Sequence, residues 1–454
     1  MEHYPTMKPS EGGLCGETPV STYSARREDT VRDEYDDSIA GRKLAPESLV
    51  MSYGYRPEWS EGAIKSPIFQ TSTFVFESAA EGKRFFELAE GSADAEPGEK
   101  LGLIYSRLNN PDLEILENRL TLWDGAERGL VFASGMAAIT TTILAFVRPG
   151  DVLLHTVPLY GGTDHFVHDV LPEFGVRPVE WEPTMTEGDV DAELDAVMSG
   201  RRLAAILMET PANPTNDLFS IAMARRIADR HSEPGQRVPV AVDNTFLGPL
   251  WQHPLEHGAD LVIYSATKYI GGHSDLIAGA VLGSKDLMGK VAGMRTVLGS
   301  MATPLNSWLM MRSLETLDLR MRRETATAEL IAAFLSTHPK VAEVRYLGLL
   351  RDGDPGYEIY REQAEGPGAM ISFWIDGGEE EAFRFIDSLS LIHLAVSLGS
   401  TETLVEHPAT MTHTGVDPDE KKKLRVNGSL VRLSIGVENP DDLIHDIANA
   451  LDAI

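Results

Sequence analysis

Two apolar runs in the middle of the chain each end in polar side chains, and this pattern constrains the fold most strongly. Residues 238–242 read Val-Pro-Val-Ala-Val and lead into Asp243, while residues 261–263 read Leu-Val-Ile and lead into a polar cluster that includes Lys268. Short β-branched runs of this kind are typical of buried strands. Open α/β sheets place their ligands at the carboxyl ends of strands. The pattern therefore predicts an α/β fold with a binding site at these strand ends.

The residue types in the polar cluster indicate a particular chemistry. Ser265 and Thr267 supply hydroxyls and Lys268 supplies an ammonium, so together they suit an anion such as phosphate. A lysine after a strand is most often a solvated surface residue, but a desolvated lysine loses its proton readily and can form a Schiff base. An aspartate at one strand end and a lysine at the next, as in Asp243 and Lys268, match the two anchors of pyridoxal phosphate.

The sequence Ser-Ala-Thr-Lys-Tyr-Ile-Gly-Gly-His-Ser-Asp at residues 265–275 resembles the lysine motif of the Cys/Met-metabolism pyridoxal-phosphate enzymes. That family includes cystathionine γ-synthase, cystathionine lyases, methionine γ-lyase and O-acetylhomoserine sulfhydrylase. The resemblance runs from about residue 51 to the C-terminus. It implies the fold-type I pyridoxal-phosphate transferase fold, with a mostly parallel sheet in a large domain and a small α+β domain after it.

The domain organisation follows from this resemblance and from the apolar pattern. We expect a polar N-terminal extension at residues 1–50, an arm at 51–112 that contributes to the neighbouring subunit's site, a large cofactor-binding domain at 113–313 and a small C-terminal domain at 314–454. Strands and helices alternate from about residue 113 to 290, which favours a parallel sheet covered on both faces. In the small domain we expect strands at 370–375, 392–398 and 430–437, and helices at 317–337, 379–389 and 440–453.

A second motif, Tyr-Ser-Arg-Leu-Asn-Asn-Pro-Asp at residues 105–112, resembles the family's Tyr-Ser-Arg-x-x-Asn-Pro-Thr, with Asp112 in the last place. By itself this sequence is equally typical of a capped turn before a helix. The resemblance implies that Tyr105 and Arg107 reach the neighbouring subunit's site and hold the cofactor phosphate, a role that suits a guanidinium fork. It therefore predicts a homo-oligomer, either a dimer or a tetramer.

Three further stretches carry expected cofactor contacts. Small residues around Gly135 and Met136 stand at a strand-to-helix turn, where they fit an ordinary helix cap and equally an anion held by backbone N–H groups. The resemblance assigns the amides of Gly135 and Met136 to phosphate. It also implies that Tyr160 stacks on the cofactor ring and acts as an acid and base at the substrate's γ-position, and that Asn213 hydrogen-bonds the ring oxygen.

The expected substrate contacts lie in the C-terminal part of the chain. Arg432 interrupts an apolar strand, and a buried arginine needs an anion, either in an internal salt bridge or on a ligand. The resemblance assigns Arg432 to the substrate's α-carboxylate and Ser397 to the substrate loop. Relatives that handle cystathionine carry a glutamate before that serine, whereas this chain has Val396. An apolar side chain there suits a short, uncharged γ-substituent.

The resemblance implies γ-elimination from methionine or a similar γ-substituted L-amino acid, with Lys268, Tyr160 and Asp243 as catalytic residues. The alternatives are γ-replacement, of the cystathionine γ-synthase or O-acetylhomoserine sulfhydrylase type, and elimination of an unusual group such as a halide. One departure bears on this choice, because methionine γ-lyases carry a cysteine two residues after the tyrosine and this chain has Gly162. A β-elimination, a transamination and a non-catalytic scaffold are further classes, and the intact Lys268 and Asp243 argue against a scaffold.

Composition excludes several other classes of function. The formal net charge of -29 disfavours nucleic acid and anionic membranes as partners. The single cysteine, Cys15, cannot form an intramolecular disulfide and is typical of a reducing cytoplasm. The sequence has neither a secretion signal nor a run of 18 apolar residues. His253 and His257 have a metal-like spacing, but Pro254 lies between them, so we expect no metal.

Overall fold

The computed structural model describes residues 37–97, 99 and 101–454. Residues 1–36 of the predicted N-terminal extension, including Cys15, lie outside the described residues. The chain divides into two compact units, and residues 78–102 belong to one of them while residues 37–77 and 103–454 form the other. The larger unit contains both sheets and the candidate site.

A seven-stranded sheet forms the centre of the larger unit. Its order is β3-β9-β8-β7-β6-β4-β5, and only β9 runs antiparallel to its neighbours. The expected α/β fold with a mostly parallel sheet is therefore confirmed. The strands are β3 (Arg128–Phe132), β4 (Val152–Thr156), β5 (Arg177–Trp181), β6 (Leu203–Glu209), β7 (Val240–Asp243), β8 (Leu261–Tyr264) and β9 (Gly279–Gly283).

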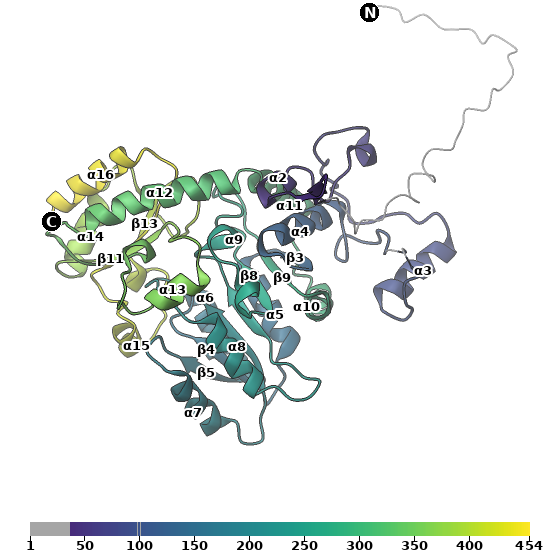
Figure 1. Ribbon diagram of the computed structural model, residues 1–454, viewed down its shortest axis with the longest axis horizontal. Coiled ribbons are helices and arrows are strands. Elements are labelled where there is room, and N and C mark those ends of the chain that lie inside the picture. The colour runs from purple at the N-terminus through teal and green to yellow at the C-terminus, as the bar shows by residue number, and fades with distance from the viewer. Residues whose placement is uncertain (1–36, 98, 100) are drawn as a thin grey trace, which may run out of the picture. The chain divides into compact units, whose positions relative to one another are not determined.

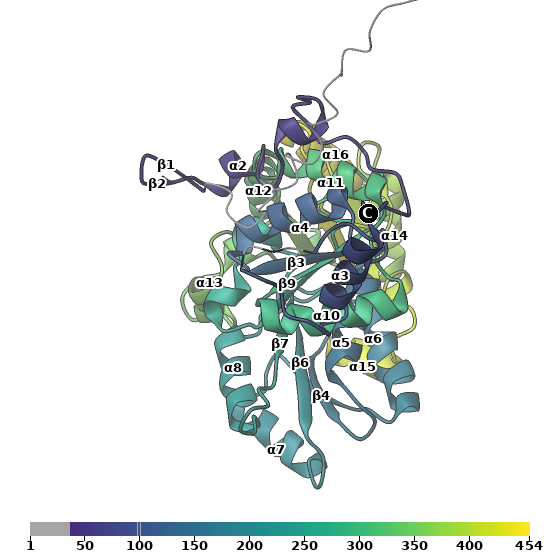
Figure 2. The same ribbon diagram turned by 90° about the vertical axis from the view of Figure 1, so that its right-hand side faces the viewer.

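Helices cover both faces of this sheet (Figure 2), and its strands β4, β6, β7, β8 and β9 are buried along their whole length. Successive residues of a strand point to opposite faces. Leu153 of β4 packs in the cluster beneath α5 (Gly135–Phe146) and α10 (Lys285–Leu298), while Leu154 packs in the cluster beneath α7 (Glu187–Val197) and α8 (Ile221–Arg230). The sheet is thus buried on both sides and offers a ligand only its strand ends.

Three longer helices complete the larger unit and lead to the second sheet. They are α4 (Pro111–Asp124), α11 (Pro304–Leu314) and α12 (Leu317–Leu335), and Figure 1 shows α12 extending toward the C-terminal elements. Asn110 caps α4 by accepting a hydrogen bond from the Asp112 N–H, so the capped turn expected at this motif is present. The short elements are β1 (Ser38–Ile39), β2 (Arg42–Lys43), α2 (Pro46–Leu49), η1 (Pro57–Ser60), α6 (Gly161–His165), η2 (Phe166–Val170), η3 (Leu171–Phe174), α9 (Gly248–Trp251) and η4 (Pro254–His257).

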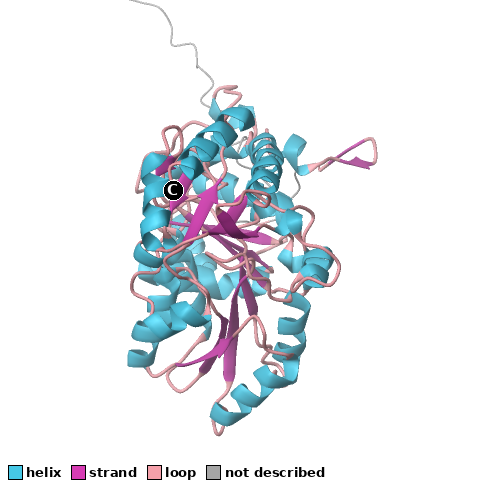
Figure 3. Ribbon diagram, turned by 90° about the vertical axis from the view of Figure 1, so that its left-hand side faces the viewer, coloured by secondary structure: helices cyan, strands magenta, loops and turns pink. Residues whose placement is uncertain are grey.

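The second sheet has five strands in the order β10-β11-β14-β13-β12. An apolar cluster joins this sheet to α12 and to the helices at residues 379–388 and 440–452. Figure 3 shows the two large sheets surrounded by helices. The strands are β10 (Val341–Arg345), β11 (Met370–Ile375), β12 (His393–Leu394), β13 (Leu404–Glu406) and β14 (Leu430–Ser434). The remaining elements are η5 (Leu347–Leu349), α13 (Tyr357–Gln363), α14 (Glu379–Ser388), η6 (Pro408–Thr410), α15 (Pro418–Lys423) and α16 (Pro440–Asp452).

The strand expected at residues 392–398 is wrong in its second half. Only His393 and Leu394 pair as β12, and the Ala395 N–H still reaches the carbonyl of Val405 at 3.1 Å. The chain then leaves the sheet, and the Ser397 hydroxyl accepts a hydrogen bond from Lys268. This contact with a residue from the other sheet takes the place of further strand pairing.

The smaller unit contains α3 (Ala79–Ala89), which Ser78 caps by accepting from the Glu81 N–H at 3.1 Å. The acidic segment that begins at residue 87 therefore starts inside this helix. Arg84 holds the following turn, because its guanidinium donates to Glu99 at 2.8 Å and to the carbonyl of Asp94 at 2.8 Å.

None of the helices in residues 37–97, 99 and 101–454 is long and apolar enough to cross a membrane. Within the same residues, His, Cys, Asp and Glu side chains form no cluster of three or more that would hold a metal ion.

One buried acid on α12 gives the fold a predicted pH dependence. Glu324 is fully buried, neither of its carboxyl oxygens has a hydrogen-bond partner, and burial raises its pKa to about 8. The folded protein keeps a proton that an unfolded glutamate releases near pH 4.5, so this group's contribution to the free energy of unfolding falls as pH rises from about 4.5 to about 8.

Glu324→Gln is neutral at every pH and should remove this contribution. The melting temperature of the variant minus that of the wild type should therefore increase between about pH 5 and about pH 9, by on the order of 5 °C. Thermal unfolding followed by circular dichroism measures the difference. A difference that stays constant across this range would contradict the buried, protonated state of Glu324.

Candidate active site

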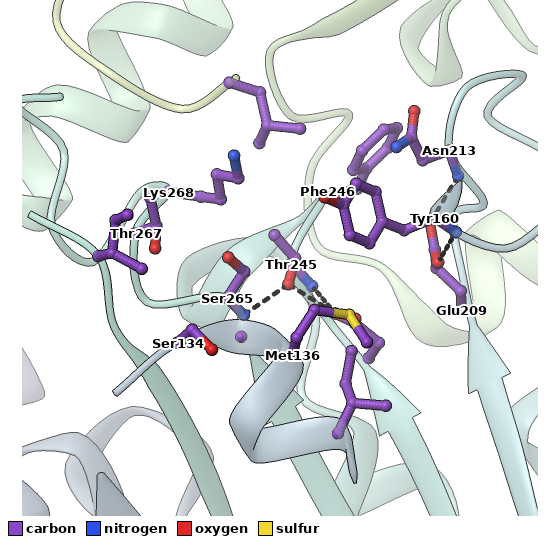
Figure 4. Close-up of a pocket in the computed structure, with 15 residues that line it drawn as sticks. Ser134, Met136, Tyr160, Glu209, Asn213, Thr245, Phe246, Ser265, Thr267 and Lys268 are labelled. Carbon is purple, nitrogen blue, oxygen red and sulfur yellow. Dashed lines mark hydrogen bonds between the residues drawn. The ribbon is translucent and has the colours of Figure 1, made fainter. Parts of the chain in front are cut away.

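A cavity of about 230 Å³ lies where the carboxyl ends of β6 and β7 and the loops after β4 and β8 meet the first turn of α5. Figure 4 shows its lining, with Lys268 and Tyr160 extending toward the cavity from opposite sides of the view. The lining residues are Ser134, Gly135, Met136, Ile139, Tyr160, Glu209, Asn213, Asp243, Thr245, Phe246, Ser265, Thr267, Lys268, Ile277 and Leu398.

Lys268 lies in the turn after β8, where its N–H donates to the carbonyl of Ser265 at 3.0 Å. Its amine donates to the Ser397 hydroxyl at 2.9 Å. Burial lowers the pKa of this amine to about 8, the positive charge of Arg432 adds to the effect and Glu406 opposes it. The amine therefore loses its proton much more readily than an ordinary lysine, as a nucleophile or base requires.

Asp243 ends β7 and is buried, and burial raises the pKa of its carboxyl to about 6. Thr245 holds this carboxylate through its N–H at 3.1 Å and its hydroxyl at 2.5 Å. The same hydroxyl oxygen accepts the N–H of Ser265 at 2.9 Å. Thr245 thus links the ends of β7 and β8, and an anionic oxygen remains in the cavity to hold a protonated ring nitrogen.

The first turn of α5 forms the wall beside Ser265. Ser134 caps the helix by accepting from the Ala137 N–H at 3.0 Å, and the earlier N–H groups of a first turn have no acceptor inside the helix. A Cβ on Gly135 would lie 2.8 Å from the Cβ of Ser265, so only glycine lets the turn approach the strand end this closely. The turn can therefore present the N–H groups of Gly135 and Met136 to an anion.

Thr267 is held by a different contact. Its hydroxyl oxygen accepts the N–H of Ala278 at 3.0 Å and lies 3.2 Å from the carbonyl of the same residue. The loop after β8 is therefore fixed to the start of β9, with the Thr267 side chain in the cavity wall.

Tyr160 and Asn213 follow β4 and β6, and both line the cavity. The Tyr160 side chain is 42% exposed, so its ring faces open space in the cavity. A Cβ on Gly162 would lie 2.8 Å from the Tyr160 ring and 3.2 Å from the Met136 sulfur. Because Gly162 has no side chain, the Tyr160 ring can adopt this conformer without a steric clash.

Arg432 on β14 is buried and bonds Glu406 of its own sheet and two loop residues, Asn213 and Ser397. One guanidinium nitrogen donates to the Asn213 side-chain oxygen at 2.8 Å and to Glu406 at 2.9 Å, and the other donates to the carbonyl of Ser397 at 2.8 Å. The internal salt bridge that the sequence left open is therefore present. Arg432 itself is not among the lining residues, although Asn213 is.

Two of the sequence-predicted residues take different positions around Lys268. Ser397 contacts the lysine amine. Val396 has a side chain that is 59% exposed and does not line the cavity, whereas Leu398, two residues later, does. Leu398, Ile277 and Ile139 supply apolar surface to the cavity.

Tyr105 and Arg107 stay outside the cavity of their own chain. The Arg107 guanidinium lies 5.8 Å from the centre of the Tyr105 ring and donates to the carbonyl of Thr296 at 2.9 Å. The Tyr105 side chain is 40% exposed. Among the described residues that line the cavity, Lys268 is the one cationic side chain, so the chain's own lining lacks the guanidinium that a phosphate would be expected to meet.

Sequence reasoning missed several residues that the structure brings into this site. Glu209, Thr245 and Phe246 line the cavity, and Glu406 pairs with Arg432. Glu209 carries the same signal that identified Asp243, because it is a polar residue directly after the apolar run of β6. The partner of Arg432 has no such local signal, since it lies on another strand.

These features are those of a fold-type I pyridoxal-phosphate enzyme: a partly buried lysine and a buried aspartate after neighbouring strands, beside a helix turn with free N–H groups. The chain belongs to the Cys/Met metabolism PLP-dependent enzyme family, whose model matches residues 47–452.

The chain is similar to proteins of this family along most of their length. The chain is 40% identical over 403 residues to an L-methionine gamma-lyase of Pseudomonas putida, covering 88% of this chain and 96% of that protein. It is 35% identical to an O-succinylhomoserine sulfhydrylase of Pseudomonas aeruginosa, covering 92% and 98%. A solved cystathionine gamma synthase from Xanthomonas oryzae pv. oryzae, in complex with cystathionine, superposes with a TM-score of 0.80 at 30% identity, covering 91% and 99%.

The residues present fit pyridoxal phosphate. The cavity offers a deprotonatable amine at Lys268, a carboxylate at Asp243 and, on the wall beside Ser265, hydroxyl and N–H donors for a phosphate.

The environment of Lys268 predicts when its amine becomes reactive. In the cofactor-free protein, the rate at which acetic anhydride acetylates Lys268 should rise with pH and level off above about pH 8, whereas a free lysine titrates near ~10.4. Peptide mass spectrometry after short labelling measures this rate. Arg432→Gln removes a cation that disfavours the ammonium, so the midpoint should move to higher pH. A wild-type midpoint close to that of a free lysine would contradict the predicted desolvation.

Proposed function

We propose that this protein eliminates the γ-substituent of methionine or a similar γ-substituted L-amino acid. The observation that carries the proposal is the agreement of two features. The chain is 40% identical to a methionine gamma-lyase over 88% of its length, and the cavity that Lys268 lines also carries apolar side chains, Ile277 and Leu398. An uncharged thioether or ester suits such surface, whereas a distal ammonium would be desolvated there.

The roles that we propose follow the geometry. Pyridoxal phosphate, when bound, withdraws electrons from the substrate's α-carbon. Lys268 would hold the cofactor and, once free, remove and return the proton at the α-carbon. Asp243 would keep a proton on the ring nitrogen. Tyr160 would stack on the ring and give a proton to the departing γ-group, and Asn213 would hydrogen-bond the ring oxygen.

The phosphate would bind to Ser265, Thr267 and the N–H groups of Gly135 and Met136. Arg432 would orient the substrate's α-carboxylate, with Ser397 beside it. This role is compatible with the salt bridge to Glu406, because the Nε of Arg432 is buried and has no partner. In this proposal, residues 113–313 form the cofactor-binding domain and residues 314–454 form the small domain.

A second candidate is γ-replacement, in which a nucleophile takes the place of the departing group. Relatives with names of this type match at 35% identity, namely the O-succinylhomoserine sulfhydrylase and a cystathionine gamma-synthase of Arabidopsis thaliana. The two reactions share every residue discussed so far. They differ in whether a second substrate enters the cavity, so product analysis separates them.

A substrate panel tests the proposal. With methionine, O-acetylhomoserine and cystathionine as single substrates, the purified protein should show its highest kcat/KM with methionine or another uncharged γ-substituent, releasing ammonia, a 2-oxo acid and the γ-group. The Lys268→Ala variant is the control and should lose activity with all three while keeping its fold, because both proton transfers need this amine. A clear preference for cystathionine, or efficient joining of cysteine to a homoserine ester, would overturn the elimination assignment.

We further propose that the active unit is at least a homodimer, in which Tyr105 and Arg107 complete the phosphate site of the neighbouring subunit. Both residues lie outside the cavity of their own chain, Tyr105 is partly exposed, and the described lining has one cation, Lys268. A phosphate carries up to two negative charges and is best bound by a guanidinium fork. A guanidinium from a second copy would supply the missing charge.

Mixing two inactive variants tests this arrangement. Arg107→Ala should bind the cofactor weakly, and Lys268→Ala should be inactive. After subunit exchange, each hybrid dimer has one site with an intact Lys268 and an intact Arg107 from the other chain, so a 1:1 mixture should regain activity at about a quarter of all sites. Cofactor loading and initial rates measure the recovery. If Arg107 served its own chain, the mixture would stay as inactive as its parts.

A further inference from the structure

Glu209 lies in the cavity wall, at the end of β6. It is the last residue of β6, its side chain is 6% exposed, and it lines the cavity. β6 lies between β4 and β7, and Glu209 is in register with Asp243. Its own N–H donates to the Thr156 hydroxyl at the end of β4, at 2.9 Å. The residue is therefore fixed to the strand ends on both sides.

The two carboxyl oxygens of Glu209 accept hydrogen bonds from two different loops. One accepts the N–H of Tyr160 at 2.8 Å, and the other accepts the N–H of Asn213 at 2.8 Å. Figure 4 shows both bonds converging on the one side chain. Tyr160 ends the loop after β4, directly before α6, and Asn213 lies in the loop after β6, so one side chain holds the backbone of both.

We propose that Glu209 is a positioning residue, which sets the Tyr160 ring and the Asn213 amide in place by holding their main-chain N–H groups. Asn213 in turn accepts from Arg432, so the position of that guanidinium also depends on the contact. The consequence for catalysis rests on the proposed function, in which Tyr160 and Asn213 contact the cofactor. The hydrogen bonds themselves do not depend on it.

A glutamate is suited to this task in a way that its amide is not. Both carboxyl oxygens can accept a hydrogen bond, whereas a glutamine side chain offers one acceptor and one donor. Glutamine at position 209 would therefore turn an NH2 group toward one of the two N–H donors and lose that contact. Burial and the neighbouring Asp243 raise the pKa of Glu209 to about 8, while the N–H groups of Tyr160 and Asn213 favour the charged form and oppose this rise.

Hydrogen exchange in the cofactor-free protein tests the contact directly. In the wild type, the amides of Tyr160 and Asn213 should be protected. In each of the variants Glu209→Gln and Glu209→Asp, at least one of these two backbone amides should exchange about tenfold faster or more. The glutamine side chain has only one acceptor, and the aspartate side chain is one methylene shorter. Glu324→Gln replaces another buried carboxyl, on α12, that makes no hydrogen bond to either loop, and is the matched control, with both amides unchanged.

The cofactor provides the second measurement. The dissociation constant for pyridoxal phosphate, from titration of the cofactor-free protein, should rise about tenfold or more in Glu209→Gln and remain near the wild-type value in Glu324→Gln. Wild-type exchange at both amides in Glu209→Gln and Glu209→Asp would overturn the proposal. Faster exchange with unchanged cofactor binding would keep Glu209 as a holder of the two loops and count instead against the assigned roles of Tyr160 and Asn213.

Discussion

The burial of charged side chains at the ends of parallel strands is the constraint on which the site depends. A buried acid or base is unfavourable unless hydrogen bonds or opposite charges stabilise it. Here the in-register strands β6 and β7 bring Glu209 and Asp243 side by side, and β8 places Lys268 in the following turn. Thr245 and the N–H groups of two loops satisfy the carboxyl oxygens. The apolar sheet thus ends in a polar layer whose members hold one another in place.

Much of this layer could be predicted from the sequence, because each residue that was found follows an apolar run directly. Polar residues after an apolar run indicate Lys268 and Asp243, and small residues at the start of a helix indicate the turn at Gly135. The same rule applied to β6 would have found Glu209. Glu406 could not be found in this way, because its partner is 26 residues away in sequence and their pairing depends on the register of β13 with β14. That register is a tertiary property.

Two strands of the large sheet, β5 and β9, carry a weak sequence signal. β5 contains a proline and a glutamate, Arg-Pro-Val-Glu-Trp, which fits an edge strand but weakens the apolar signal. β9 begins and ends in glycine, and glycine lowers the propensity for a strand. The structure gives the reason for the first glycine, since a Cβ on Gly279 would lie 2.2 Å from the carbonyl oxygen of Ser134. The strand must pass close to the turn that caps α5, and only glycine allows this.

The proton affinity of Lys268 depends on residues from both sheets. Its turn follows β8, but the charges that act on the amine belong to Arg432 and Glu406 of the second sheet, and its hydrogen-bond acceptor is Ser397. Arg432 lowers the pKa of the amine and Glu406 raises it. Because the two are paired, the pKa falls less than it would beside an isolated guanidinium. Because Arg432 also bonds Asn213 and Ser397, any displacement of the second sheet would alter both the lysine and the loop that faces it. The turn after β8 carries the lysine and burial is the largest cause of the fall in its pKa, while the charges of the second sheet adjust that pKa in both directions.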